Sequence, residues 1–181
     1  MQFLPTQIPD VILVEAPKFG DHRGFFMETY HVKKFNDGGI AVKFIQDNHV
    51  SSQKNILRGL HYQLKFPQGK LIRCIQGEIL DIAVDIRKSS STFGEWVGEI
   101  LSSQNARQLY VPPGFAHGYV VRSELAEVEY KCTDIYHPED DYGIRWNDPG
   151  IGIDWGVEHP ILSGRDKQQP LLKDMKEKLF K

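Results

Sequence analysis

The fold class is decided by the stretch Ile79-Leu80-Asp81-Ile82-Ala83-Val84-Asp85-Ile86-Arg87. Its even-numbered residues are all apolar and share one face of an extended chain, whereas Asp81, Asp85 and Arg87 share the other. An alternation with period two predicts a β-strand with two different faces.

Similar short strands are expected at residues 95–101, 108–111, 118–122 and 128–136, and turn-forming pairs such as Gln76-Gly77 lie between them. Helix patterns are few and peripheral: one short helix is expected at residues 32–37, and a C-terminal helix at about 171–180. Many short strands without alternating helices favour an antiparallel β-sandwich or barrel. With no visible linker or repeat, residues 1–181 are predicted to form a single domain.

Composition narrows the class of protein. The formal net charge of −2 argues against general nucleic-acid binding. No secretory signal and no apolar run long enough to cross a bilayer are visible, so no membrane association is expected. The two cysteines, Cys74 and Cys132, fall in apolar strand-like segments and are expected to be buried free thiols. Together these features predict a cytoplasmic protein.

A histidine next to cations is the first candidate for chemistry. His61 lies in the run LRGLHYQ at residues 57–63, close to Arg58 and ahead of Lys70. Imidazole transfers protons at neutral pH, and the two cations suit an anionic substrate or a developing oxyanion. A buried, hydrogen-bonded histidine beside surface cations is the alternative.

A metal site is the obvious competing role for such a histidine. Gln63 stands two residues after His61, where a second histidine would share its face, and His117 is the one further good ligand. Two ligands are too few for a catalytic metal, so none is expected.

Three further segments carry groups that suit a site. On a regular strand at 128–136, Tyr130, Cys132, Asp134 and Tyr136 would face the same way, as a ligand-facing wall or as amphipathic core residues. Residues 21–28 place an arginine, two aromatic rings and a carboxylate around a glycine, which suits a flat charged ligand or a surface hairpin. Asp166 could orient a histidine, or it could cap a turn.

These segments, in this order, resemble the dTDP-4-dehydrorhamnose 3,5-epimerase family from end to end. The motifs that carry the resemblance are 21–28, Gln46-Asp47-Asn48, Arg58-Gly59-Leu60-His61, Gly69-Lys70, Gly77-Glu78, 111–118, 130–134, 146–149 and 163–166. The resemblance implies an all-β cupin-type jelly roll with short peripheral helices. It also implies a homodimer that exchanges an N-terminal arm of about residues 1–30, and an isomerase that uses no metal or other cofactor.

The resemblance also assigns roles to residues. It implies that His61 is the general base, Asp166 its orienting partner, Tyr130 the general acid on the opposite face of the sugar, and Lys70 the cation near the C4 oxygen. Tyr136 matches an aromatic residue that stacks on the thymine, and the acidic contact is left open among Glu139, Asp140 and Asp141. The other matched substrate-binding positions are Arg23, Phe26, Glu28, Gln46, Asn48, Arg58, His117 and Arg165.

The implied reaction converts dTDP-4-dehydro-6-deoxy-D-glucose into dTDP-4-dehydro-6-deoxy-L-mannose, a precursor for rhamnose or a related deoxysugar. Both carbons to be inverted, C3 and C5, flank the C4 ketone, so a base, an oxyanion partner and an opposed acid suffice. A mono-epimerase or ketoisomerase, a non-catalytic sugar-nucleotide binding module and a metallo-cupin remain alternatives. One geometric conflict is visible: Arg58 and His61 have opposite parity, so either a bulge separates them or Arg58 reaches around the strand end.

Overall fold

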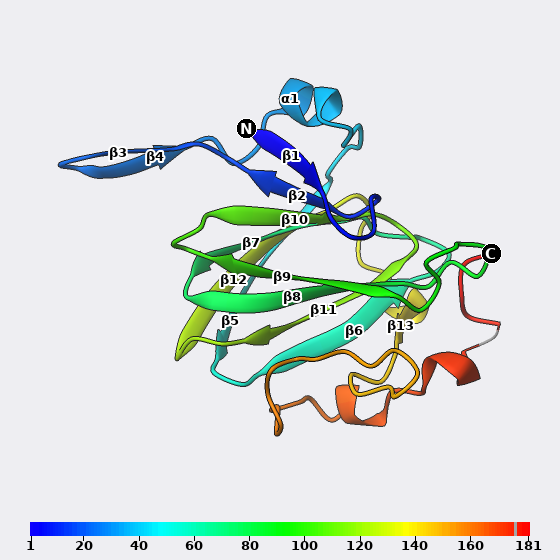
Figure 1. Cartoon of the computed structure of the whole chain (residues 1–181). Helices are drawn as coiled ribbons and strands as arrows, with labels where there is room; N and C mark the ends of the chain where they lie inside the picture. Colours follow the sequence, from blue (N-terminus) through cyan, green and yellow to red (C-terminus); the bar gives the residue numbers. More distant parts are fainter. Residues whose placement is uncertain (176) are drawn as a thin grey trace.

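The computed structural model describes residues 1–175 and 177–181, and its core consists of two facing β-sheets (Figure 1). The larger sheet has six strands in the order β1-β2-β10-β7-β12-β5, and the smaller has five in the order β13-β6-β11-β8-β9. All neighbouring strands in both sheets are antiparallel. The all-β cupin-type jelly roll is confirmed, as two open sheets.

The strands of the larger sheet are β1 (Gln2–Pro5), β2 (Ile12–Glu15), β5 (Gln46–Gln53), β7 (Lys70–Gln76), β10 (Arg107–Val111) and β12 (Leu125–Cys132). Those of the smaller sheet are β6 (Leu57–Gln63), β8 (Glu78–Asp85), β9 (Trp96–Ser102), β11 (Phe115–Val121) and β13 (Asp141–Gly143). All five strand predictions are therefore confirmed as strands, with shifted ends.

The largest shift in a strand end concerns β12, which stops at Cys132 instead of continuing to Tyr136. The ladder ends at Thr133, whose backbone N–H still donates to the Gly69 carbonyl, while the N–H of Gly69 donates to Oγ1 of Thr133 instead of to its backbone carbonyl. The face shared by Tyr130 and Cys132 therefore cannot be extended by simple alternation to Asp134 and Tyr136.

Strand β8 is buried on both faces, which explains why it is so rich in aliphatic residues. Ile79 and Ala83 belong to the core between the two sheets. Ile82 and Val84, together with Ile86 just beyond the strand, face outward, where Trp155, Met175 and Leu179 cover them. The polar side chains of this strand are consequently enclosed as well, and Asp81 and Asp85 are each 0% exposed. Buried carboxylates need hydrogen-bond partners. Asp85 accepts from Arg87, and Asp81 has His117 at Oδ1 while its Oδ2 has no partner among the described residues.

Of the two peripheral helices predicted from the sequence, the N-terminal one is present and the C-terminal one is not. Helix α1 (Val32–Asp37) is found where it was predicted. The expected helix at about 171–180 is wrong: a 3-10 helix (Leu172–Asp174) is present, and residue 176 lies outside the described residues. Met175 and Leu179 are buried on the outer face of the smaller sheet, so their spacing reflects packing against strands. Two further 3-10 helices are Pro138–Asp140 and Asp166–Gln168.

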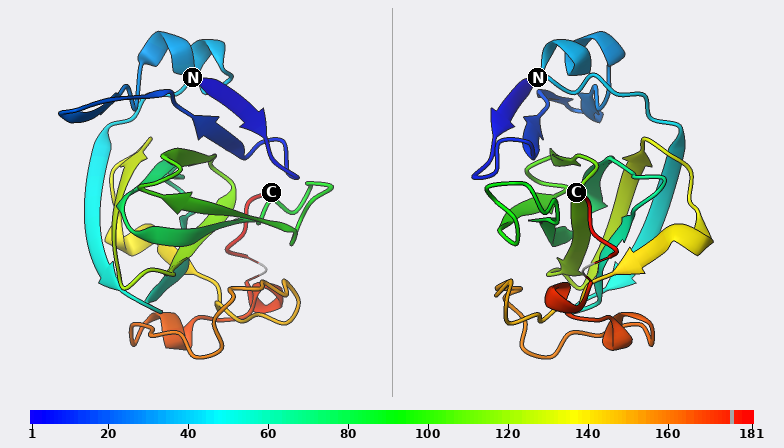
Figure 2. Two further views of the ribbon diagram at one scale, coloured as in Figure 1. Left: turned by 60° about the vertical axis from the view of Figure 1, so that its left-hand side comes forward. Right: turned by 90° about the vertical axis from the view of Figure 1, so that its right-hand side faces the viewer.

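One part of the N-terminal arm projects from the molecule and is largely exposed. Strands β3 (Lys18–Asp21) and β4 (Gly24–Met27) form a hairpin that extends away from the body of the molecule (Figure 1, Figure 2). Phe19, Phe25 and Phe26 on this hairpin are 62%, 63% and 69% exposed. In the described part of the chain, no helix is long and apolar enough to cross a membrane. Cys74 and Cys132 are free and buried, as predicted.

Candidate active site

A cavity of about 350 Å³ opens between the two sheets, and it contains most of the predicted chemistry. Strands β5, β7 and β12 of the larger sheet and β6 of the smaller sheet contribute to its walls. Of the predicted site residues it brings together Gln46, Asn48, His61, Lys70, Tyr130 and Tyr136. Its other lining residues are Tyr62, Gln63, Gln68, Cys132 and Asp141.

A bulge in β6 sets the direction of His61. On β11, His117 is the partner of His61 and Tyr119 is the partner of Arg58, so three steps along β6 match two along β11. The extra residue places Arg58 and His61 on the same side, so of the two explanations left open for their parity the register shows the bulge. Gly59 has φ +122°, and a Cβ there would lie 2.6 Å from the Cα of Gly118. Only glycine fits this position.

His61 is held by a buried carboxylate. Its Nε2 lies 2.6 Å from Oδ1 of Asp166, whose side chain is 5% exposed while that of His61 is 33% exposed. A carboxylate only accepts hydrogen bonds, so the ring carries its proton on Nε2, and Nδ1 keeps a lone pair. Burial opposes the ionisation of Asp166, but the hydrogen bonds from His61 and Ser163 outweigh it, and the net result is a lowered pKa.

Lys70 and Tyr130 reach the cavity from the larger sheet. Burial lowers the pKa of the Lys70 ammonium, although the nearby Cys132, Asp141 and Asp81 oppose this shift. Burial raises the pKa of the Tyr130 phenol. The phenol is therefore fully protonated at neutral pH and can donate a proton. His61, on the opposing sheet, lines the same cavity.

The rim of the cavity contains a hydrogen-bonded aromatic and ionic group. The Tyr136 hydroxyl donates to Oδ2 of Asp141 at 2.9 Å, and Arg165 forms an ion pair with the same carboxylate. Of the three acidic candidates, Asp141 lines the cavity. Asp140 is buried and accepts from the backbone N–H groups of Lys65 and Phe66.

Two predicted residues lie beside the cavity without being part of its lining. His117 is 8% exposed, and its Nε2 lies 2.8 Å from Oδ1 of Asp81. The guanidinium of Arg58 donates through Nε to Oγ of Ser52. Asp81 was not proposed as a site residue from the sequence, because only the pairing of β8 with β11 places it next to His117.

The arm residues are not brought to this cavity by their own chain. Arg23 is 79% exposed and pairs with Asp21, and Glu28 pairs with Lys34. Phe26 lies on the projecting hairpin. Within one chain, Arg23, Phe26 and Glu28 are therefore not among the residues that line the cavity.

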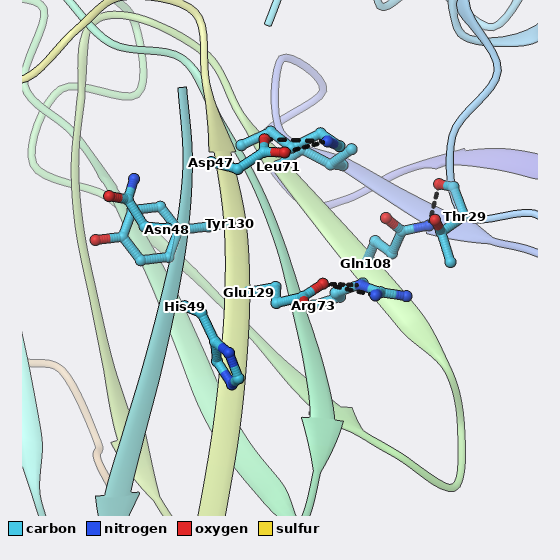
Figure 3. A pocket seen from close by; sticks show the side chains of 10 residues that line it. Thr29, Asp47, Asn48, His49, Leu71, Arg73, Gln108, Glu129 and Tyr130 are labelled. Atoms are coloured by element: carbon cyan, nitrogen blue, oxygen red, sulfur yellow. Dashed lines mark hydrogen bonds and ion pairs between the residues drawn. The ribbon is translucent and has the colours of Figure 1, made fainter. Parts of the chain in front are cut away.

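A second hollow lies on the outer face of the larger sheet, and it lacks a comparable set of groups (Figure 3). Its charged side chains pair with each other, Arg73 with Glu129 at 2.6 Å and Lys131 with Asp47 at 3.0 Å. Asn48 and Tyr130 belong to both hollows, but Figure 3 shows their side chains on the opposite side of the strands from Arg73. Among residues 1–175 and 177–181, no three His, Cys, Asp or Glu side chains are grouped as metal ligands.

Comparison of the chain with known proteins identifies its family. The family model described as dTDP-4-dehydrorhamnose 3,5-epimerase matches residues 5–174. The chain belongs to this family. The resemblance read from the motifs is thereby confirmed, and the chain is an isomerase of the epimerase type.

Individual epimerases of the family match over nearly the whole chain. The dTDP-4-dehydrorhamnose 3,5-epimerase of Shigella flexneri is 53% identical over 168 residues, covering 92% of this chain and 93% of that protein. The enzyme of Salmonella typhimurium is 53% identical over 175 residues, covering 95% and 96%. The crystal structure of dTDP-6-deoxy-D-glucose-3,5-epimerase from Legionella pneumophila in complex with dTDP-4-keto-L-rhamnose has a TM-score of 0.97 and 46% identity, covering 99% of this chain and 97% of that one.

Proposed function

We propose that the cavity between the sheets converts dTDP-4-dehydro-6-deoxy-D-glucose into dTDP-4-dehydro-6-deoxy-L-mannose by inverting C5 and C3. One observation carries the proposal: His61 is hydrogen-bonded to Asp166, and Tyr130 faces the same cavity from the other sheet. A non-catalytic binding module would need neither an oriented base nor an opposed phenol. The family membership supports the same reaction.

The base in this reaction is the Nδ1 atom of His61. The C3 and C5 protons are acidic because each carbon flanks the C4 ketone, and loss of either proton gives an enolate. Asp166 holds the ring through Nε2 and stabilises the imidazolium that forms when Nδ1 takes the proton. Without this carboxylate the ring would be free to rotate and its cationic form would lose its partner.

The enolate charge lies largely on the C4 oxygen, and Lys70 is the cation assigned to it. An ammonium fixed in a partly dehydrated site stabilises such a charge more strongly than water does. Tyr130 then delivers a proton to the opposite face of the carbon, and this inverts the configuration. Its raised pKa keeps it a proton donor at neutral pH.

The nucleotide end of the substrate is assigned to the rim. Tyr136 is 49% exposed and offers a ring for stacking on the thymine, while Arg165 and Asp141 fix its hydroxyl end. Arg58 suits the pyrophosphate, since its guanidinium can bind phosphate oxygens bidentately. The remaining polar contacts to the substrate are assigned to Gln46, Asn48 and His117.

The arm supports a homodimer in which each subunit completes the site of the other. Three phenylalanines on β3 and β4 remain exposed in the single chain, and burying them against a second copy would be favourable. Arg23, Phe26 and Glu28 would then reach the cavity of the partner. An equimolar mixture of the inactive variants His61→Ala and Arg23→Ala, unfolded and refolded together, should regain activity, since one site in each mixed dimer is intact. Absence of any regained activity in a proven mixed dimer would contradict the exchange.

The compartment follows from the thiols. Two free, buried thiols fit a reducing compartment. We therefore assign the enzyme to the cytoplasm.

The reaction is tested by proton NMR in deuterated water. The wild type should exchange the C5 and C3 protons of the substrate and form the L-manno product, and a product inverted at one carbon only would identify a mono-epimerase. His61→Ala should lose exchange at both carbons by at least about a hundredfold while its circular dichroism is retained. Exchange at the wild-type rate would remove His61 as the base. Calorimetric binding of dTDP in the presence of a chelator tests the expected independence of metal.

A further inference from the structure

Gln63 has a set of contacts that the proposed reaction does not use. It lies on β6 two residues after His61, lines the cavity and is only 3% exposed. Its Nε2 donates to the carbonyl oxygens of Phe66 at 2.7 Å and Ile135 at 3.2 Å, and its Oε1 accepts from the N–H of His137 at 2.8 Å. A buried side-chain amide with three hydrogen-bond partners is fixed in one orientation and in turn fixes the backbone groups that it binds.

Two of these partners lie on either side of one residue. The carbonyl of Ile135 and the N–H of His137 belong to the two peptide groups that flank Tyr136. The N–H of Tyr136 itself donates to Oε1 of Gln46 at 2.8 Å. Side-chain amides from β5 and β6 thus hold the backbone of Tyr136, which lies beyond the end of β12 and outside any ladder.

The same strand also fixes the far end of the Tyr136 ring. Gln63 is the register partner of Asp141 on β13, and Oδ2 of Asp141 accepts from the Tyr136 hydroxyl. Gln63 therefore connects to Tyr136 at the backbone directly and, through the β6–β13 pairing, at the hydroxyl. His61 lies on the same strand, so one rigid element, β6, positions both the base and the aromatic ring.

We propose that Gln63 is a positioning residue that presets Tyr136 for stacking on the nucleobase of the substrate. The inference rests on the proposed function, because it assumes that the nucleotide stacks on Tyr136. An exposed loop residue would otherwise lose conformational freedom when the ligand binds, and prior ordering removes that cost. An amide is needed because leucine makes no hydrogen bond and a carboxylate cannot donate to the two carbonyls.

Substitution of Gln63 should weaken nucleotide binding and leave the proton-transfer groups in place. Gln63→Leu is expected to raise the Kd for dTDP and the KM for the nucleotide sugar about tenfold, the size expected when the backbone of one residue must be ordered on binding. At saturating substrate, kcat should stay within about threefold of the wild-type value, because loss of binding shared by the ground and transition states changes KM alone.

Gln63→Glu gives a second readout that depends on protonation and keeps the side-chain volume. The carboxylate faces two carbonyl oxygens, but the protonated acid can donate to one of them and accept from His137. Its dTDP affinity, divided by that of the wild type at each pH, should therefore improve as the pH falls from about 8 to about 6, since two facing carbonyls and burial raise a carboxyl pKa. If Gln63→Leu does not fold, the pH dependence of Gln63→Glu tests the inference instead.

A double-mutant cycle on dTDP affinity decides whether Gln63 acts through Tyr136. In a Tyr136→Ala background the change Gln63→Leu should cost no more than about twofold, because the ring it positions is gone. Gln68→Leu is the matched control: Gln68 lines the same cavity, but its Nε2 bonds to the Asp134 carbonyl, which does not flank Tyr136. Its effect should be the same in both backgrounds.

An equal loss from Gln63→Leu in both backgrounds, or a pH-independent affinity ratio for Gln63→Glu, would overturn the inference. Failure of the proposed function looks different, because the wild type itself would then neither bind dTDP nor form the L-manno product.

Discussion

The Nε2 atom of His61 lies 2.6 Å from Oδ1 of Asp166, although 105 residues separate them in the chain. His61 is fixed in the middle of β6, and Asp166 begins a 3-10 helix that packs on that strand. The N–H of Asp166 donates to Oγ of Ser163, which orders the turn that presents the carboxylate. The pair sets both the tautomer and the direction of the imidazole.

Asp166→Asn should lower kcat about a hundredfold or more, because an amide gives the imidazolium no counter-charge and can turn its NH₂ towards the ring. The nucleotide contacts do not involve Asp166, so the Kd for dTDP should stay within about twofold. Steady-state kinetics and calorimetry on the same preparation check both values. A fall in dTDP affinity equal to the fall in kcat would indicate a general disturbance of the site.

Tyr130→Phe should slow formation of the L-manno product about a hundredfold while the substrate protons exchange with deuterated water much closer to the wild-type rate. Removal of the phenol leaves the base and Lys70 in place, so deprotonation continues and the enolate is reprotonated from the side of His61. NMR of one sample reports both rates. Equal losses of exchange and inversion would remove Tyr130 as the acid.

Activity should decline at alkaline pH as Lys70 loses its proton, and this should begin below the usual lysine pKa because burial lowers the pKa of Lys70. The protonated form is the active one, so activity due to Lys70 is present below its folded pKa and lost above it. Lys70→Arg, whose guanidinium stays charged, should move the decline to higher pH. An unchanged decline in the kcat profile of Lys70→Arg would assign it to another group.

Asp85 should contribute about 2 kcal/mol to stability at neutral pH. Burial opposes its ionisation, but hydrogen bonds from Arg87, Ser90 and Thr92 prevail and lower the pKa of Asp85 from 3.8 to about 2. Because the folded pKa is below the unfolded one, this stability is present above pH 3.8 and is lost as the pH falls towards 2. Urea unfolding of Asp85→Asn should therefore show a large deficit at neutral pH and a smaller one near pH 3.

Asp10→Asn is the control for this comparison, because Asp10 contacts the same Arg87 at 2.9 Å but is 55% exposed. An exposed ion pair contributes about 0–1 kcal/mol, so its deficit should be small at both pH values. Similar deficits for Asp10→Asn and Asp85→Asn at neutral pH would contradict the role given to burial and to the Ser90 and Thr92 hydroxyls.

The strand pattern could be predicted because side-chain direction along a strand is a local property. The alternation at residues 79–87 located β8. The parity conflict between Arg58 and His61 indicated an irregularity, and the register shows that it is a bulge in β6. Alternation failed at Asp134 and Tyr136, because the ladder ends at Thr133, where a side-chain oxygen replaces the backbone carbonyl as the acceptor for Gly69. The helical spacing of Met175 and Leu179 also gave a wrong prediction, because such a spacing of apolar residues can arise from packing against a sheet.

The sequence by itself determined the all-β class, the family and the kinds of groups available for proton transfer. The tertiary structure alone decided which groups meet: Asp81 with His117, Gln63 with the peptides around Tyr136, and Asp141 with the Tyr136 hydroxyl. Periodicity fixes the face on which a side chain lies, since it follows from backbone geometry. The partner across a sheet or a loop depends on register, bulges and chain path, which only the packed core sets.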